Sequence, residues 1–110
     1  AMDTRRLFRY SAATFNAHRI HYDLPYAMGV EKYPGLVVHG PMQATLLMGA
    51  AIRHRGGSPA RFRFRGVHPM FHTHDLRLIG LDDGAAMELC TAAPPADGGH
   101  QGLRARAEWA

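Results

Sequence analysis

The chain has 110 residues with a single cysteine, 46% hydrophobic and 20% charged residues, and a net charge of +4. This length predicts one domain, which we place at residues 3–110 because Ala1 ahead of Met2 is typical of a residue left by tag removal. The lone Cys90 excludes an internal disulfide, and no apolar run is long enough to span a membrane. We therefore expect a cytoplasmic protein that does not bind membranes.

The first third of the chain contains only short predicted elements. Residues 7–11 are interpreted as a short strand, and residues 12–17 as a helical turn or loop. Asp23 is a suitable helix cap and Pro25 lies near the first turn, which predicts a short helix over residues 26–30.

The clearest predicted element is a helix over residues 41–54. Pro41 takes the first helical position, and Gly56 follows the end of the segment. Only Gln43 and Thr45 interrupt its apolar surface before the last turn. A helix that is apolar nearly all round must be buried, so we expect a sheet to curl around it.

Four strand-like runs follow this helix and are separated by turn residues. In the first run, Phe62 and Phe64 alternate with Arg61, Arg63 and Arg65, which is the period of a strand. Short connections favour antiparallel hairpins. The runs cover residues 60–65, 76–79, 86–91 and 103–109. The sequence therefore predicts an α+β fold in which a curved antiparallel meander wraps one helix.

A polar loop provides the first candidate site. Asn16, His18 and His21 are close enough in sequence for a tight turn to point Asn16 and His21 into one pocket. A histidine there can act as an acid or base near neutral pH. The alternative is that these are ordinary exposed loop histidines.

The start of the long helix provides the second candidate site. The free N–H groups at Gly40 and after Pro41 carry the partial positive charge of a helix terminus, and a glycine lets a ligand approach the backbone. Such a donor can stabilise a carbonyl oxygen that becomes an enolate. The alternative is that Gly40 and Pro41 merely start a helix.

Two segments carry a resemblance to a known family. Residues 16–23, Asn-Ala-His-Arg-Ile-His-Tyr-Asp, and residues 35–42, Gly-Leu-Val-Val-His-Gly-Pro-Met, resemble the hydratase-2 motif of MaoC-like hotdog proteins. They are most similar to the branch of hydroxyacyl-thioester dehydratases and mesaconyl-C4-CoA hydratases. The resemblance covers essentially the whole chain. It implies a hotdog fold and the reversible addition of water to a 2-enoyl thioester.

The resemblance also implies roles for four residues. His21 matches the catalytic histidine, and Gly40 matches the glycine whose amide faces the thioester oxygen. Asn16 stands where most hydratase-2 enzymes have an aspartate. Asparagine cannot accept a proton, so it is assigned to orienting water or substrate. His18 is counted with Gly40 among the substrate-binding residues.

The implied substrate is a coenzyme A or acyl-carrier thioester, and no cofactor or metal is required. We expect a homodimer, or pairing with a second hotdog half, because related proteins carry two halves in one longer chain. A thioesterase on the same fold and a non-catalytic hotdog subunit remain alternatives.

Two further clusters are given weaker interpretations. His72 and His74 could bind a metal, but without a third ligand they are better interpreted as surface histidines. The arginines at 61, 63 and 65 could follow nucleic-acid phosphates or contact coenzyme A, but a solvated or interface-facing strand is favoured over nucleic-acid binding.

Overall fold

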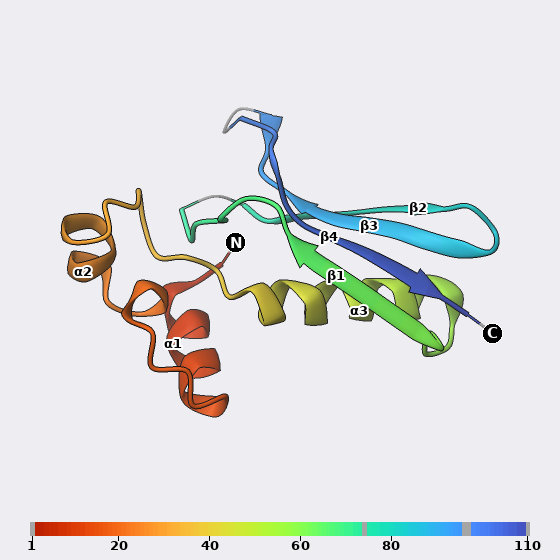
Figure 1. The fold of residues 1–110 in the computed structure, drawn as a ribbon, viewed down its shortest axis with the longest axis horizontal. Coiled ribbons are helices and arrows are strands. Elements are labelled where there is room, and N and C mark those ends of the chain that lie inside the picture. Colours follow the sequence, from red (N-terminus) through yellow and green to blue (C-terminus); the bar gives the residue numbers. More distant parts are fainter. Residues whose placement is uncertain (1, 74, 96–97, 110) are drawn as a thin grey trace.

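The computed structural model describes residues 2–73, 75–95 and 98–109. In Figure 1 the long helix α3 lies along a sheet, and the shorter helices α1 and α2 lie beyond one end of that sheet. The helices are α1 (Thr4–Ala13), the 3-10 turn η1 (Arg19–His21), α2 (Leu24–Gly29) and α3 (Gly40–Arg55). The strands are β1 (Arg61–Gly66), β2 (Arg77–Asp82), β3 (Ala86–Ala92) and β4 (Gln101–Glu108).

The sheet is antiparallel and has the strand order β1-β4-β3-β2. The predicted meander is correct for β2, β3 and β4, which pair in sequence order. It is wrong for β1, which pairs with β4 from Arg61 opposite Glu108 to Gly66 opposite Leu103. The chain therefore crosses from one edge of the sheet to the other between β1 and β2.

The predicted strand over residues 7–11 is wrong, because this segment belongs to α1. The Asp3 side chain accepts a hydrogen bond from the Arg5 N–H and caps the helix. Leu7 and Ser11 lie one helical turn apart and are the buried residues of α1. A buried serine among arginines concealed the helical period from sequence inspection.

The other predicted helices form close to the expected positions. The Asp23 side chain accepts from the Tyr26 N–H at 3.1 Å and caps α2, as predicted. Helix α3 starts one residue earlier and ends one residue later than expected. It stops at Gly56, whose φ of 83° is the left-handed conformation that glycine tolerates.

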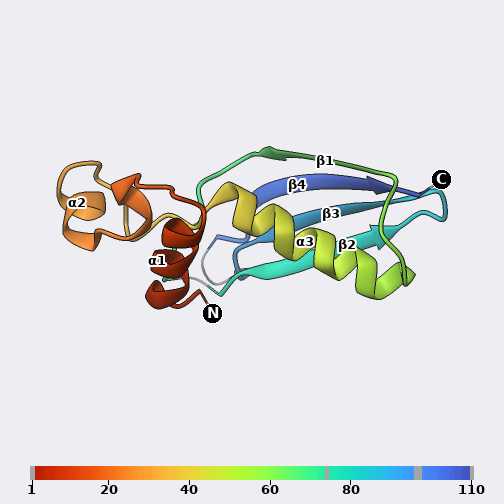
Figure 2. The ribbon, with the colours of Figure 1, turned by 90° about the horizontal axis from the view of Figure 1, so that it is seen from below.

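The sheet covers one face of α3 (Figure 2), and the burial that the sequence predicts for this helix is found on that face. The buried face consists of Gln43, Ala44, Leu47 and Ala51. Gln43 is accommodated by hydrogen bonds: its Nε2 donates to the Val38 carbonyl at 3.2 Å, and its Oε1 accepts from a threonine hydroxyl on β3 at 2.7 Å. Helix α3 is thereby fixed to the sheet by a polar link inside the core.

Two apolar clusters form the core. One fills the space between α3 and the sheet and consists of Ala44, Leu47, Ala51, Met87, Leu89, Leu103, Ala105 and Ala107. The other joins the N-terminal helices to the segment before α3 and consists of Met2, Leu7, Ala27, Leu36, Val38, Met70 and Ala93. The second cluster positions the loop that carries the predicted site.

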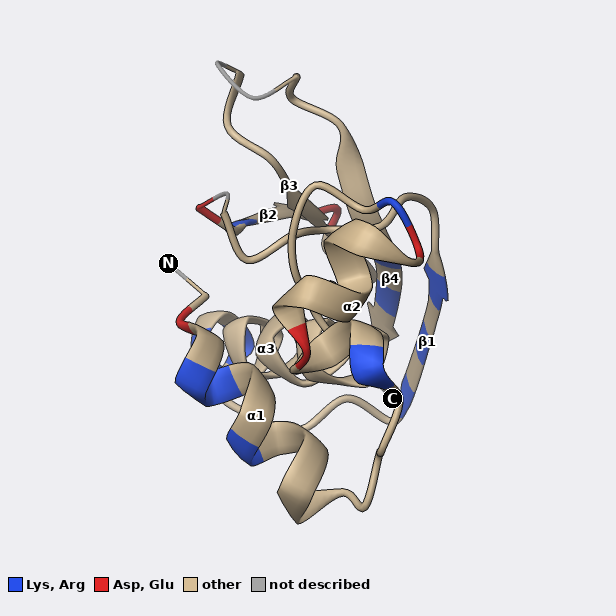
Figure 3. Cartoon of the chain, turned by 90° about the vertical axis from the view of Figure 1, so that its left-hand side faces the viewer, with Lys and Arg blue, Asp and Glu red and all other residues tan. Residues whose placement is uncertain are grey.

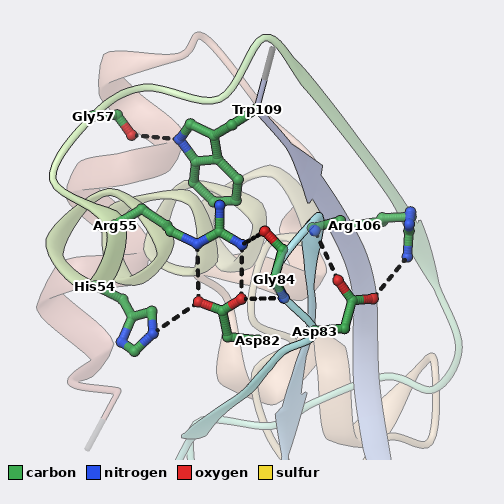
Figure 4. Close-up of polar contacts among 9 residues, drawn as sticks. His54, Arg55, Gly57, Asp82, Asp83, Gly84, Arg106 and Trp109 are labelled. Atoms are coloured by element: carbon green, nitrogen blue, oxygen red, sulfur yellow. Dashed lines mark hydrogen bonds and ion pairs between the residues drawn. The ribbon is translucent and has the colours of Figure 1, made fainter.

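A charged cluster fastens the C-terminal end of α3 to the β2–β3 hairpin (Figure 4). Arg55 donates two hydrogen bonds to the Asp82 carboxylate, at 2.9 and 2.7 Å, and one to the Gly84 carbonyl at 3.0 Å. Its guanidinium lies 4.4 Å from the centre of the Trp109 ring. These bonds hold the pKa of Asp82 well below its usual range.

Arginine side chains mark the sheet face that points away from α3. Figure 3 shows basic residues along β1 and β4, all of which are arginine. Arg65 and Arg104 are directly opposite each other in the register.

Among the described residues, no helix is both long enough and apolar enough to cross a membrane.

Candidate functional site

The loop after α1 is shaped by its own polar side chains. The His18 N–H donates to Asn16 Oδ1 at 3.1 Å, and the Ile20 N–H donates to His18 Nδ1 at 3.5 Å. The second bond caps η1, the short turn that ends at His21. Asn16 and His18 therefore build the turn that presents His21.

His21 is half-buried and has a defined tautomer. Its Nδ1 lies 2.8 Å from the Val37 carbonyl oxygen. A carbonyl oxygen can only accept, so Nδ1 carries the proton and donates it. In the neutral imidazole, Nε2 then has the free lone pair that a general base needs.

Burial lowers the pKa of His21, and the neighbouring His18, whose ring centre is 5.9 Å away, lowers it further. The hydrogen bond to Val37 acts in the opposite direction but is outweighed. His21 is therefore neutral at pH 7 and able to accept a proton.

His39 lies directly against His21 and is completely buried. The two rings are stacked, with centres 3.9 Å apart and planes 16° apart. His39 Nε2 shares a 2.7 Å hydrogen bond with the Ser11 hydroxyl. The Tyr10 ring packs against the His39 ring, with ring centres 4.6 Å apart. Burial, together with the nearby His21, lowers the pKa of His39 to about 4.

Sequence reasoning missed the contribution of Ser11 and His39. His39 stands inside the second motif, directly before the glycine that was assigned a role. A histidine between an apolar run and a helix start is a signal for burial. Ser11 gave no such signal, because only the fold brings α1 against the start of α3.

Gly40 begins α3 and lines an open pocket of about 330 Å³, together with Val37, Val38 and Gly102 among others. A Cβ added at Gly40 would meet only the Leu103 side chain, at 4.0 Å. Gly40 is also not among the glycines with positive φ. The fold of this chain therefore does not require glycine at this position, while the pocket beside the helix terminus does benefit from it.

The predicted pair of Asn16 and His21 is not brought into one described pocket. Asn16 lines an open depression of about 430 Å³ with Phe8, Phe15 and Tyr22 among others. His21 instead directs its Nδ1 at the Val37 carbonyl. Val37 lines the pocket at Gly40, but His21 is not among the residues that line it. Asn16 and His21 are connected indirectly. The Asn16 N–H donates to the Ser11 carbonyl at 2.8 Å, the Ser11 hydroxyl bonds His39, and the His39 ring stacks on His21.

His72 has a structural task. The Leu36 N–H donates to His72 Nδ1 at 2.9 Å, which holds the segment leading into α3. His74, with which His72 could have shared a metal, lies outside the described residues. The described part of the chain contains no group of three or more His, Cys, Asp or Glu side chains placed to hold a metal ion.

The sequence is similar to two curated enzymes. It is 50% identical over 92 residues to mesaconyl-C(4)-CoA hydratase of Chloroflexus aurantiacus, covering 84% of this chain and 33% of that protein. It is 39% identical over 81 residues to the mitochondrial hydroxyacyl-thioester dehydratase type 2 of Schizosaccharomyces pombe, covering 71% of this chain and 27% of that protein. The chain thus spans about a third of the length of these relatives.

The fold is similar to solved hotdog structures. The (R)-hydratase of A. caviae aligns with a TM-score of 0.73 and 15% identity over 96% of this chain and 85% of that one. The R-hydratase PhaJ1 of Pseudomonas aeruginosa aligns at 0.71 and 21%, over 97% and 72%. A chain of the ChsH1–ChsH2 complex of Mycobacterium tuberculosis aligns at 0.74 and 14%, over 97% and 86%. These likenesses establish the hotdog fold.

A family model for hydroxyacyl-thioester dehydratase type 2 matches residues 1–72, which include both predicted motifs and all of α3. The predicted fold and the predicted resemblance are therefore confirmed: the chain is a hotdog protein of the MaoC-like class and belongs to the hydroxyacyl-thioester dehydratase type 2 family.

Proposed function

We propose that this chain catalyses the reversible addition of water to a 2-enoyl thioester, and the reverse dehydration of a 3-hydroxyacyl thioester. The observation that carries the proposal is the Val37 carbonyl, which fixes the proton of His21 on Nδ1 and leaves Nε2 as a base. Val37 also lines the pocket at Gly40, so the carbonyl that holds His21 lies three residues before the helix terminus that we propose to bind the thioester oxygen. The names of the two curated relatives, a hydratase and a dehydratase, support the same reaction class.

In the hydration direction, His21 Nε2 takes a proton from a water molecule whose oxygen bonds to carbon 3 of the substrate. The double-bond electrons move toward the thioester carbonyl, and the Gly40 N–H at the start of α3 stabilises the resulting enolate oxygen. The protonated His21 then delivers its proton to carbon 2. The thioester bond remains intact, and no cofactor or metal takes part.

Asn16 and His18 contribute binding rather than proton transfer. Asn16 is uncharged and is proposed to orient the water through its amide, the role left to an asparagine in place of an aspartate. In the free chain its Oδ1 supports the turn at His18. His18 is exposed, and we place it at the substrate entrance.

We further propose that the substrate is carried by coenzyme A or an acyl-carrier protein, and that residues 3–110 act as one hotdog half beside a second. The short span relative to the curated relatives supports a second half. So does the edge strand β2, on which Leu78, Ile79 and Leu81 are exposed. Neither nucleic acid nor a membrane is a partner in this proposal, and the cytoplasm is the proposed location.

The test is incubation with crotonyl-CoA and, separately, 3-hydroxybutyryl-CoA, while enoyl absorbance and free thiol are followed together. Hydration removes the enoyl absorbance without releasing thiol. Release of thiol would identify a thioesterase, which uses the same kind of helix terminus, and no change in either signal would identify a non-catalytic subunit. His21→Ala must abolish the signal for the assignment to stand.

A further inference from the structure

Ser11 and His39 form a buried polar pair that the proposed reaction does not use directly. Ser11 is 5% exposed and His39 is 0% exposed, so neither reaches substrate. Their side chains share a 2.7 Å hydrogen bond across 28 residues of sequence, from α1 to the residue directly before α3. Burying two polar side chains costs free energy unless the bond between them is kept.

The position of His39 gives this pair a mechanical role. One side of His39 is bound by Ser11, and one face of its ring lies flat on His21 at 3.9 Å. His21 is held at its edge by the Val37 carbonyl and on its face by His39. A ring held both at its edge and on its face has little freedom to tilt.

His39 also lies on the same chain segment as Val37, which binds His21, and Gly40, which begins α3. Val37, His39 and Gly40 are nearly consecutive, so a shift of the His39 ring would move both the carbonyl that fixes the His21 tautomer and the start of α3. Helix α3 has no side-chain cap at His39, so this ring is committed to His21 and Ser11 instead.

We propose that Ser11 and His39 are positioning residues for His21: the Ser11 hydroxyl sets the angle of the His39 ring, and the face of that ring holds the His21 imidazole in its Nδ1–H tautomer with Nε2 directed at the substrate. This inference rests on the proposed function for its kinetic consequences, but not for its structural ones. A displacement of about 1 Å at a reacting group can cost roughly 100-fold in rate.

In the part of the chain that the structure describes, few titratable groups have ring contacts with His21 and His39. His18 and His39 lie beside His21, and Tyr10 and His21 lie beside His39. His39 stays neutral through the range in which His21 titrates, because burial holds its pKa at about 4. It therefore supports His21 as an uncharged surface and does not repel the imidazolium formed during turnover.

The first test replaces the hydroxyl. Ser11→Ala removes the bond to His39, whereas Thr14→Ala removes an exposed hydroxyl from the loop end of the same helix, where it bonds only the Tyr10 carbonyl. We expect Ser11→Ala to lower kcat by roughly 10-fold with little change in KM, and Thr14→Ala to leave both unchanged. An equal loss in both variants would overturn the proposal, because it would reflect a general effect of α1.

The second test replaces the ring. His39→Phe keeps a flat face against His21, while His39→Ala removes it and opens His21 to water. We expect the pKa of His21, followed by NMR titration of its imidazole protons, to rise toward its usual value in His39→Ala and to stay low in His39→Phe. Nitrogen shifts of His21 should show the Nδ1–H tautomer in the wild type and in His39→Phe, and a mixture in His39→Ala and Ser11→Ala.

The NMR measurements test whether Ser11 and His39 position His21 even if the wild-type chain hydrates no enoyl thioester, because they need no substrate. In that case the proposed function would fail and the positioning pair would be judged alone. A folded His39→Ala chain that retains the pKa and the tautomer of wild-type His21 would overturn the proposal. If His39→Ala does not fold, Ser11→Ala carries the same test.

Discussion

The two ends of α3 use polar residues in opposite ways. At the C-terminal end, Arg55 and Asp82 bond each other and the backbone, Asp82 also bonds His54, and the charges are partly exposed (Figure 4). At the N-terminal end, His21 and His39 are kept neutral by burial, and a glycine leaves the helix terminus open. A closed charged network stabilises the fold, whereas neutral groups with a free lone pair and a free N–H can do chemistry.

The largest expected effect comes from replacing the histidine near the N-terminal end of α3, with a histidine at the other end as the control. His21→Ala should reduce kcat by about 100- to 10,000-fold, the range of general acid–base catalysis, with the far-UV spectrum unchanged. His54→Ala is the matched control, because His54 lies at the opposite end of α3 and only meets Asp82. Comparable turnover in the two variants would remove His21 from the mechanism.

Gly40→Ala tests the open helix terminus. The added methyl group has room in the free chain, and alanine favours a helix by about 0.5–1 kcal/mol over glycine, so Tm should stay the same or rise. Turnover should fall, by up to the roughly 100-fold that losing one oxyanion donor costs, because the methyl group obstructs the thioester oxygen.

Gly49→Ala is the matched control in the same helix, where the new methyl group meets only the flexible Arg53 side chain. It should leave kcat unchanged. A Gly40→Ala chain that unfolds would show that glycine serves the backbone there.

Variants of Asn16 test whether His21 is the single group whose ionisation sets the pH dependence of turnover. We expect that dependence to show one limb, which follows the titration of His21. Asn16→Ala should lose rate without moving the pH limb of turnover. Asn16→Asp should raise the pKa of His21 and move the limb to higher pH, if the new carboxylate lies near the imidazole. An acidic limb that survives in Asn16→Ala would assign the work to a carboxylate such as Asp23, although that group is engaged with Tyr26 and Arg19, which lower its pKa.

The smallest effect on activity is expected at the charged end. Arg55→Ala should lower Tm and leave kcat unchanged. The pKa of Asp82 is lowered in the folded chain, so its contribution to stability is present above the unfolded carboxyl pKa of about 3.9 and is lost as pH falls toward the folded value. Thermal melts at pH 7 and below pH 3 should therefore differ more for the wild type than for Arg55→Ala.

Local signals explain which parts of the fold could be predicted. Proline and glycine marked both ends of α3, Asp23 marked the start of α2, and period-two alternation marked β1. The pairing of β1 with β4 was missed because strand order depends on long-range contacts that short loops do not reveal. Helix α1 was missed because its buried face contains Ser11, a polar residue whose hydroxyl bonds His39 across the fold.

The candidate site likewise has parts that local sequence signals predicted and parts that depend on long-range contacts. The resemblance of the motifs pointed to His21 and Gly40. In the structure, the Val37 carbonyl fixes the tautomer of His21, and the space beside Gly40 is open. The sequence suggested that a tight turn could point Asn16 and His21 into one pocket, but the residues that line the depression at Asn16 do not include His21. The stack of His21 on His39 joins residues 18 positions apart, and no spacing rule describes such a contact.

The central claim is that neutral His21, with its proton on Nδ1, is the base of the reaction. The measurement is the pH dependence of kcat/KM for hydration of crotonyl-CoA, compared with the NMR titration of His21 in the same free chain. Because kcat/KM reports groups of the free enzyme, a single limb should coincide with the pKa of His21, and both should lie below the usual value of about 6.5. A limb that does not match the titration of His21, or an activity that is flat through that range, would contradict the claim.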